Sequence, residues 1–174
     1  MLTNNWYNFF KAHFLAAYQD RNMTGISVKD YRGESWTPSG SSNYQYQMFL
    51  RGASLTSVVG SEGSNGIYFG DGNVPPTAED YRLSGNFISG LSMGAYVASV
   101  AISGGTACTT ITLTVKNNGS DAVTISEIAW VERQNTNNSL KYFMFDRTVL
   151  KSPVTIAAGG QGVVVYEFST TLPS

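Results

Sequence analysis

The stretch TTITLTVKNNGSDAVTISEIAW, residues 109–130, is the clearest indicator of fold class in this chain. Its first half alternates threonine with three aliphatic residues, Ile111, Leu113 and Val115. An alternation with period two is typical of a β-strand with one face in a core and the other facing solvent. The run NNGSD at 117–121 then predicts a turn, in which Asn118-Gly119 suits a positive φ. The stretch therefore predicts a β-hairpin of a sandwich or barrel.

The second half of the stretch changes parity. Val123 and Ile125 continue the alternation, but Ile128 and Trp130 resume it one position out of phase. An extra residue inserted into a strand shifts parity in this way, so we expect a β-bulge near Ser126 or Glu127.

Outward from this stretch, short β patterns separated by turn residues fill most of the chain. Their spacing is typical of a sandwich with roughly eight to ten strands. We predict a mainly β protein, a β-sandwich of jelly-roll or immunoglobulin-like order, with one N-terminal α-helix. The expected boundaries are residues 1–22 for the amphipathic helix and 23–174 for the β-sandwich domain. Asp146 and Arg147 are expected between two strands, as an ion pair.

The predicted N-terminal helix carries a broad aromatic face opposite an asparagine-rich one. Five aromatic residues lie on that face: Trp6, Phe9, Phe10, Phe14 and Tyr18. One interpretation is that the face covers an open end or face of the sheet. The other is that it docks on a neighbouring subunit or partner.

Charged residues make up only 13% of the 174 positions, about half the usual share, and the net charge is −1. A charge-poor surface suits an assembly, because interface cores are depleted of charge. The near-zero net charge predicts no attraction to nucleic acid or to an anionic membrane. Residues 1–20 lack the pattern of a secretion signal, and no apolar run has the roughly 20 residues needed to span a bilayer. We expect Cys108, the single cysteine, to be buried and unpaired.

Catalytic motifs are weak. Residues 90–94, GLSMG, match the G-x-S-x-G nucleophile elbow, but a strand rather than a helix follows Ser92, and the only histidine, His13, precedes it. Glu79 and Asp80 resemble an acid pair, yet adjacent acids point apart in an extended chain. We therefore predict no catalytic residue and no enzyme.

Metal and cofactor motifs are equally weak. Asp71 begins a short DGN run that lacks the further oxygen ligands of a calcium loop. His13 has no partner at ligand spacing. The sequence therefore predicts no metal site and no cofactor. Exposed tyrosines, Tyr44 and Tyr46 among them, are candidates for stacking on sugar rings, although packing in the sheet explains them as well.

Three stretches resemble a family of small virion-associated structural proteins of tailed bacteriophages. They are MLTNNWYNFFKAHF at the start, YFGDGNVPPTAEDYRL at 68–83, and the segments at 111–130 and 145–168. The resemblance implies a virion component with a β-sandwich body and carries no active site with it. It implies fold-defining roles for seven positions: Asp80, Tyr81, Leu83, Gly119, Glu127, Ile128 and Arg147.

Together these features predict a structural virion protein, at the head surface, neck or tail. Its partners would be copies of itself and other virion proteins, and it would be made in the bacterial host cytoplasm. The alternative is a carbohydrate- or host-receptor-binding module on the same particle, with a surface glycan as its ligand.

Overall fold

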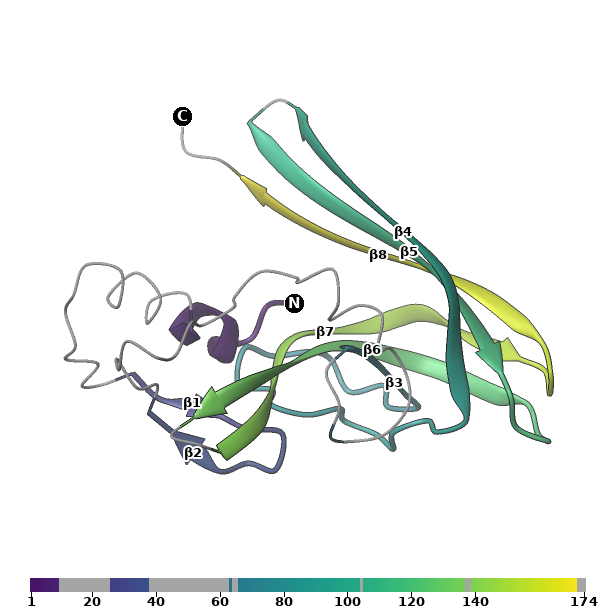
Figure 1. The fold of residues 1–174 in the computed structure, drawn as a ribbon, viewed down its shortest axis with the longest axis horizontal. Helices are drawn as coiled ribbons and strands as arrows, with labels where there is room; N and C mark the ends of the chain where they lie inside the picture. The colour runs from purple at the N-terminus through teal and green to yellow at the C-terminus, as the bar shows by residue number, and fades with distance from the viewer. Residues whose placement is uncertain (10–25, 38–62, 64–65, 104, 137–138, 172–174) are drawn as a thin grey trace. The chain divides into compact units, whose positions relative to one another are not determined.

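The computed structural model describes residues 1–9, 26–37, 63, 66–103, 105–136 and 139–171. Residues 4–9 are helical, and the described residues form eight β-strands (Figure 1). The strands are β1 (Val28–Lys29), β2 (Ser35–Trp36), β3 (Gly66–Gly70), β4 (Leu91–Ser103), β5 (Thr106–Asn117), β6 (Val123–Thr136), β7 (Ser139–Ile156) and β8 (Gln161–Thr171). The predicted mainly β class with an N-terminal helix is therefore confirmed, while the sandwich arrangement of the sheets stays a prediction.

The strands form three sheets, with the orders β1-β2, β3-β6-β7 and β4-β5-β8. This order corrects the hairpin predicted for residues 109–130. The two halves of that stretch are strands, β5 and β6, but they belong to different sheets. Pairing partners are set by non-local contacts, so a strand–turn–strand pattern does not by itself show that its strands pair.

The chain divides into two compact units. The first contains Met1–Ser89 and Thr124–Val154, and the second contains Gly90–Val123 and Thr155–Ser174. Strands β6 and β7 each begin in one unit and end in the other, so no linker marks the division in the sequence. The boundary predicted at residue 22 lies outside the described residues.

Sheet β3-β6-β7 of the first unit is buried on both faces. On one face Tyr68, Ala129 and Met144 pack with Leu83. On the other, aromatic rings of the helical segment contact aromatic rings of β6 and β7. A sheet covered on both faces needs apolar residues at successive positions rather than alternate ones.

This double burial explains the parity change that predicted a bulge in β6. Residues Glu127 to Val131 pair with β3 without a register shift, and all five are buried. The pairing with β3 thus shows no bulge near Ser126 or Glu127. A register shift lies instead in β4, between Met93 and Tyr96.

Strand β7 is continuous through Asp146 and Arg147, where the sequence predicted a break. The predicted ion pair between these two neighbours is wrong. The Asp146 carboxylate lies 2.7 Å from the Met1 ammonium, and Arg147 pairs with other carboxylates, described below. Two charged residues in sequence suggested a turn, but the partners supplied by distant segments allow both to stay inside a strand.

The second unit is built on the antiparallel sheet β4-β5-β8. The predicted alternation in β5 is present, with the side chains of Ile111, Leu113 and Val115 all buried. The opposite face of the strand carries threonines that are only half-buried. No helix among the described residues is both long enough and apolar enough to cross a bilayer.

Candidate functional site

A cluster of polar contacts in the first unit surrounds the buried guanidinium of Arg147. Its Nε donates a hydrogen bond to Asp80 Oδ2 at 2.7 Å, and its Nη1 donates to Glu127 Oε2 at 2.6 Å. Nη2 donates to the carbonyl oxygens of Val74 and Pro75, at 2.9 and 3.2 Å. One side chain from β7 thereby joins β6 to the loop that follows β3. Arginine suits this position because its planar group presents several donors in fixed directions.

Glu127 is held by more than Arg147. Its carboxylate accepts hydrogen bonds from the Ser84 amide at 3.1 Å, the Ser84 hydroxyl at 3.0 Å and the Gly85 amide at 2.8 Å. Burial opposes ionisation of this carboxyl, but these hydrogen bonds and the one from Arg147 outweigh it, so the pKa of Glu127 lies below its ordinary value. The carboxylate is therefore charged at neutral pH.

Glycines make room for this carboxylate. A Cβ on Gly70 would lie 2.8 Å from Glu127 Oε1, and a Cβ on Gly72 would overlap Glu127 Oε1 and Ser84 Oγ. A Cβ on Gly85 would meet the backbone of Gly72. The backbone can approach the carboxylate this closely only because these positions carry no side chain.

Asp80 is held in the same way from the loop itself. Its Oδ2 accepts from the Thr77 amide at 2.8 Å and its Oδ1 from the Thr77 hydroxyl at 2.9 Å. Burial alone would raise the pKa of Asp80, but the hydrogen bonds from Thr77 and Arg147 lower it overall. The structure has a hydrogen-bonded turn at residues 78–79.

These contacts define what the arrangement does. Both carboxylates are held ionised and each is bonded to Arg147, so neither is set up to give up or accept a proton near neutral pH. The cluster of Asp80, Glu127 and Arg147 fastens the loop over residues 71–85 to two strands. Its chemistry is that of a buried structural ion network.

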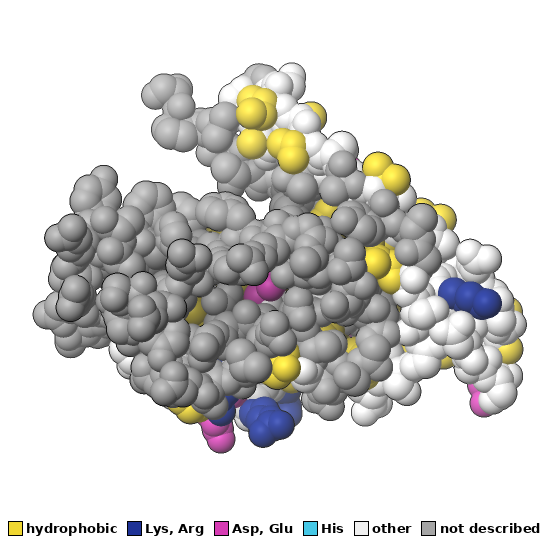
Figure 2. Space-filling model, viewed as in Figure 1, with side chains coloured by type: hydrophobic (Ala, Val, Ile, Leu, Met, Phe, Trp, Pro, Cys, Tyr) yellow, Lys and Arg dark blue, Asp and Glu magenta, His cyan; other side chains and the backbone are white. Residues whose placement is uncertain are grey.

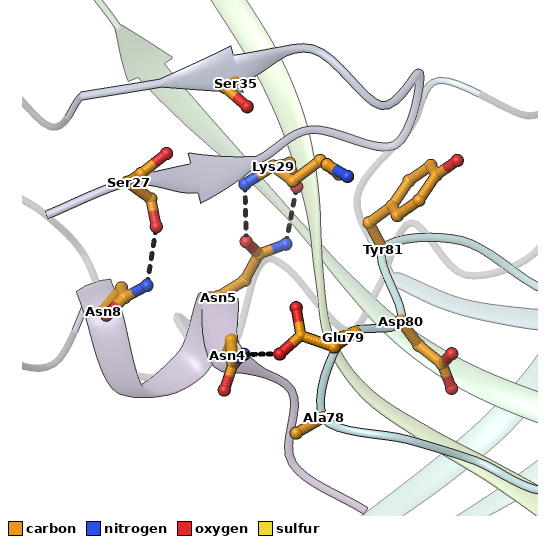
Figure 3. Close-up of a pocket in the computed structure, with 10 residues that line it drawn as sticks. All are labelled: Asn4, Asn5, Asn8, Ser27, Lys29, Ser35, Ala78, Glu79, Asp80 and Tyr81. Carbon is orange, nitrogen blue, oxygen red and sulfur yellow. Dashed lines mark hydrogen bonds between the residues drawn. The ribbon is translucent and has the colours of Figure 1, made fainter.

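A second candidate site is an open polar pocket of about 270 Å³ beside the helical residues (Figure 3). Ten residues line it: Asn4, Asn5, Asn8, Ser27, Lys29, Ser35, Ala78, Glu79, Asp80 and Tyr81. All ten belong to the first unit. The helix, the β1-β2 ribbon and the loop over 78–81 each contribute side chains (Figure 3).

Asparagine side chains tie the walls of this pocket together. Asn5 donates from Nδ2 to the Lys29 carbonyl at 2.6 Å and accepts at Oδ1 from the Lys29 amide at 2.7 Å. Its side-chain amide thus pairs with the backbone of β1 as a residue of a neighbouring strand would. Asn8 donates to the Ser27 carbonyl at 2.6 Å, and Asn4 donates to Glu79 Oε1 at 2.6 Å. These contacts shape the pocket and leave Oδ1 of Asn4, Oδ1 of Asn8 and Oε2 of Glu79 as acceptors without a described hydrogen bond.

The ammonium group of Lys29, which lines the pocket, lies over an aromatic ring. Lys29 Nζ lies 4.8 Å from the centre of the Tyr81 ring, and the Arg82 guanidinium lies 5.6 Å from the same centre. Cations on this ring make it a poor platform for stacking a sugar. What remains is a set of hydrogen-bonding groups suited to a small ligand rich in hydroxyls.

The side chains of Glu79 and Asp80 point apart, as expected for adjacent acids. The Glu79 carboxylate turns toward Asn4, whereas the Asp80 carboxylate turns away from it and bonds to Arg147 (Figure 3). Ser92 of the G-x-S-x-G match lies in β4 and accepts a 2.7 Å hydrogen bond from Asn118 Nδ2. Asp71 bonds to Asn86, which lowers its pKa. His13, Tyr44 and Tyr46 lie outside the described residues.

Two of the five aromatic residues predicted as an interface are described, and both pack inside their own unit. Phe9 is fully buried, with its ring centre 4.9 Å from that of Phe143. Trp6 is half-buried against Trp130, at 5.6 Å between ring centres. For these two residues, covering the sheet accounts for the aromatic face. Phe10, Phe14 and Tyr18 lie outside the described residues.

The positions that the resemblance singled out fall in different places. Asp80, Glu127 and Arg147 meet in the ion cluster, Leu83 and Ile128 are buried, and Tyr81 lies against Gly33 at the pocket. Gly119 is exposed in a turn of the second unit, and its φ is outside the left-handed region. Positive φ, which the sequence suggested there, therefore does not explain this glycine.

Asn117 and Glu132 are among the buried polar residues that sequence reasoning missed. Asn117 is fully buried and holds the turn after β5, and Glu132 is a buried carboxyl that accepts from Trp130 Nε1 at 2.8 Å. Asparagine at a strand end is a known signal for a side chain that bonds its own turn. Nothing in the sequence marks Glu132, because glutamate in a strand is ordinarily exposed.

Within the described part of the chain, no three side chains of the metal-binding types are grouped to hold an ion. The chain matches no protein-family model, no curated protein and no solved structure.

Proposed function

We propose that this protein is a non-enzymatic structural component of a tailed-bacteriophage virion, acting through contacts between subunits. The observation that carries the proposal is the sheet β4-β5-β8, whose described residues expose five large β-branched side chains: Val97, Val100, Ile102, Val163 and Val165. Figure 2 shows hydrophobic side chains exposed along these strands. Exposed apolar groups on a sheet that holds only two charged residues, Lys116 and Glu167, are typical of a surface that another protein covers.

The ion cluster supports the same proposal. It fastens a loop to two strands through hydrogen bonds of Arg147. No buried side-chain nitrogen or oxygen of the described residues lacks a hydrogen-bond partner, which favours a rigid structural role over a catalytic one. A rigid unit that exposes an apolar sheet suits a component repeated by symmetry. The sequence resemblance names the particle, and the head surface, neck and tail are the places it offers.

Purified particles of the phage that encodes the chain provide the test. Quantitative mass spectrometry of washed particles should detect this chain in a fixed ratio to the major capsid protein, and imaging of the particle should locate it. Recovery of the chain only as free protein in the lysate, with none in washed particles, would refute the proposal.

A second function, binding of a carbohydrate on the virion or its host, is favoured by the polar pocket. Its acceptor oxygens suit the hydroxyls of a sugar. A glycan array probed with the full chain and with Ser35→Trp tests this alternative, because Ser35 is exposed and lines the pocket. Binding that Ser35→Trp abolishes and Ser120→Trp, in the other unit, preserves would support it.

A further inference from the structure

One face of the sheet β4-β5-β8 forms a continuous surface of valine and threonine, here called the valine face. The register places Val97, Thr112 and Val165 side by side across the three strands. Thr114 and Val163 form the neighbouring pair. Directly paired residues of antiparallel strands point to the same face. Val97 and Val163 are each 67% exposed, and Val165 is 57% exposed, so this surface lies open.

The charges of the sheet are confined to two residues. Across β4, β5 and β8, the sequence holds one base, Lys116, and one acid, Glu167. Lys116 pairs with Ser92 and Gln161 at one end of the valine face. Glu167 pairs with Thr110 at the other end, where the Thr110 hydroxyl donates to its carboxylate at 3.2 Å. Six residues of strand put the two charges about 20 Å apart, too far to pair within one molecule.

We propose that the valine face packs against the same face of a second copy of this chain, around a two-fold axis. This inference rests on the proposed function, which requires contacts between subunits, and it names the surface and the partner. A face with one positive end and one negative end is complementary to itself when the second copy is reversed.

The charge positions select one arrangement. If the axis runs across the strands, midway between the rows of Thr112 and Thr114, each strand lies antiparallel to its own copy. Lys116 then lies next to Glu167 of the second copy, twice by symmetry. Val163 likewise faces Val165 of the second copy, so aliphatic groups meet at the centre. An axis along the strands would leave Lys116 and Glu167 of the two copies at opposite ends.

The size of the face predicts how tightly the copies bind. A three-stranded sheet about 40 Å long and about 14 Å wide offers roughly 500 Å² per copy, which is at the low end for a specific interface. We therefore expect a dimer with a dissociation constant in the micromolar range, strengthened in a particle by the many contacts made at once.

The opposite face of the sheet supplies a matched control. Val100 is 70% exposed and lies on the same strand as Val97, but it pairs with Thr109 and so points to the other face. V97K and V100K thus place the same charge on equally open positions of β4. V97K should raise the dimer dissociation constant at least about tenfold, because it buries two uncompensated ammonium groups. V100K should change the constant less than about twofold.

Analytical ultracentrifugation of the full chain between about 1 and 200 μM measures both constants, and thermal melting checks that the variants stay folded. Equal weakening by V97K and V100K would overturn the proposal, because it would indicate pairing through a strand edge or the other face. A wild-type chain that stays monomeric over this range would overturn it as well.

Exchange of the two charges tests the arrangement without touching the valines. K116E and E167K should each weaken association roughly tenfold, since each creates two like-charge contacts in place of two weak ion pairs. A mixture of K116E with E167K should form a mixed dimer, and the double variant K116E/E167K should recover self-association. No recovery in either case would show that the copies are not arranged as proposed.

The outcomes separate this inference from the proposed function. Presence of the chain in washed particles, together with unaltered association of V97K, would reject the valine face and leave the structural role intact. Absence from particles, together with a dimer sensitive to V97K, would reject the virion role and leave the interface intact.

Discussion

Arg147 and Glu127 form a fully buried ion pair, with Nη1 of the arginine 2.6 Å from Oε2 of the glutamate. The guanidinium also reaches Asp80 and two backbone carbonyls, and the carboxylate also accepts from two amides and a hydroxyl. Each charge is thus solvated by the protein in place of water. Removing one member of such a network leaves the others buried without compensation.

Replacement of Arg147 by methionine should therefore destabilise the protein by about 3–5 kcal/mol, the cost of leaving a buried carboxylate without its cation. Urea unfolding followed by circular dichroism measures the change. R147K should recover only part of the loss, because one ammonium cannot contact Asp80, Glu127 and both carbonyls together.

Lys151 provides the control for this experiment, because it lies on the same strand and is exposed. K151M should change the free energy of unfolding by less than about 0.5 kcal/mol. The double variant R147M/E127Q should be less destabilised than the sum of the single variants, because the two residues interact. Strict additivity would argue against the network described here.

The loss of stability at acid pH should depend on Asp80 and Glu127. Folding lowers the pKa of both groups below their ordinary values of 3.8 and 4.5. Their contribution is therefore complete above about pH 5 and is lost as the pH falls through the lowered folded-state pKa values. Between pH 5 and pH 2 the free energy of unfolding should fall steadily, and D80N should reduce this slope. An identical slope in D80N and wild type would contradict the assignment.

The sequence alone could predict local patterns of this fold but not its pairings. The alternation of Ile111, Leu113 and Val115 depends on one burial asymmetry, which is visible in the order of residue types. The strands that pair with β5 are not visible in this way. Its neighbours in the sheet are β4 and β8, whereas the sequence pattern suggested β6. An alternation with period two is expected only where one face of a strand is open. Strand β6 is buried on both faces, so its change of parity wrongly predicted a bulge.

The ion cluster illustrates the same division for the candidate site. Resemblance singled out Asp80, Glu127 and Arg147 separately, but their meeting depends on bringing together residues up to 67 positions apart. Gly70 and Gly72 make room for the carboxylate of Glu127, which belongs to a distant strand, so the residues around these glycines do not reveal their role. Spacing along the chain carries no signal for contacts of this range.

Glu132 should make stability depend on pH near neutrality. Burial raises its pKa to about 7 from an ordinary 4.5, against the hydrogen bond from Trp130, which lowers it. A raised acid pKa contributes stability that is complete below about pH 4.5 and is lost as the pH rises through about 7. A difference of about 2.5 pH units corresponds to about 3 kcal/mol between the two limits.

E132Q removes the titration and keeps an oxygen for Trp130, so its free energy of unfolding should be nearly constant between pH 5.5 and pH 8.5. Wild type should lose stability over the same range. D121N, which alters an exposed carboxyl outside the valine face, should follow the wild-type curve. A pH profile of E132Q that parallels wild type would show that another group causes the dependence.

Gly72 should tolerate no side chain. An added Cβ would overlap the Ser84 hydroxyl, the Glu127 carboxylate and the Gly85 amide, none of which can retreat without breaking the ion network. We expect G72A to cost about 2–4 kcal/mol in urea unfolding, through overpacking and lost hydrogen bonds. G119A should cost less than about 1 kcal/mol, because its Cβ would lie 3.1 Å from Asn117 Oδ1 in an exposed turn without positive φ. Equal costs would show that steric exclusion at Gly72 is unimportant.

Asn117 and Asn118 are neighbours of the same type with opposite surroundings. The Asn117 amide is buried, donates to the carbonyls of Asp121, Ile156 and Ala157 at 2.8, 3.1 and 3.2 Å, and accepts from the Gly119 amide at 2.9 Å. The Asn118 side chain is exposed and donates only to the Ser92 hydroxyl among the contacts described. N117A should therefore leave buried groups unsatisfied and cost about 2–4 kcal/mol, whereas N118A should cost less than about 1 kcal/mol. Urea unfolding of both variants measures the difference.

N117D tests the cause, since a carboxylate cannot donate to three carbonyls and should be at least as damaging as alanine. Costs within 0.5 kcal/mol for N117A and N118A would mean that position in the turn matters and the buried hydrogen bonds do not.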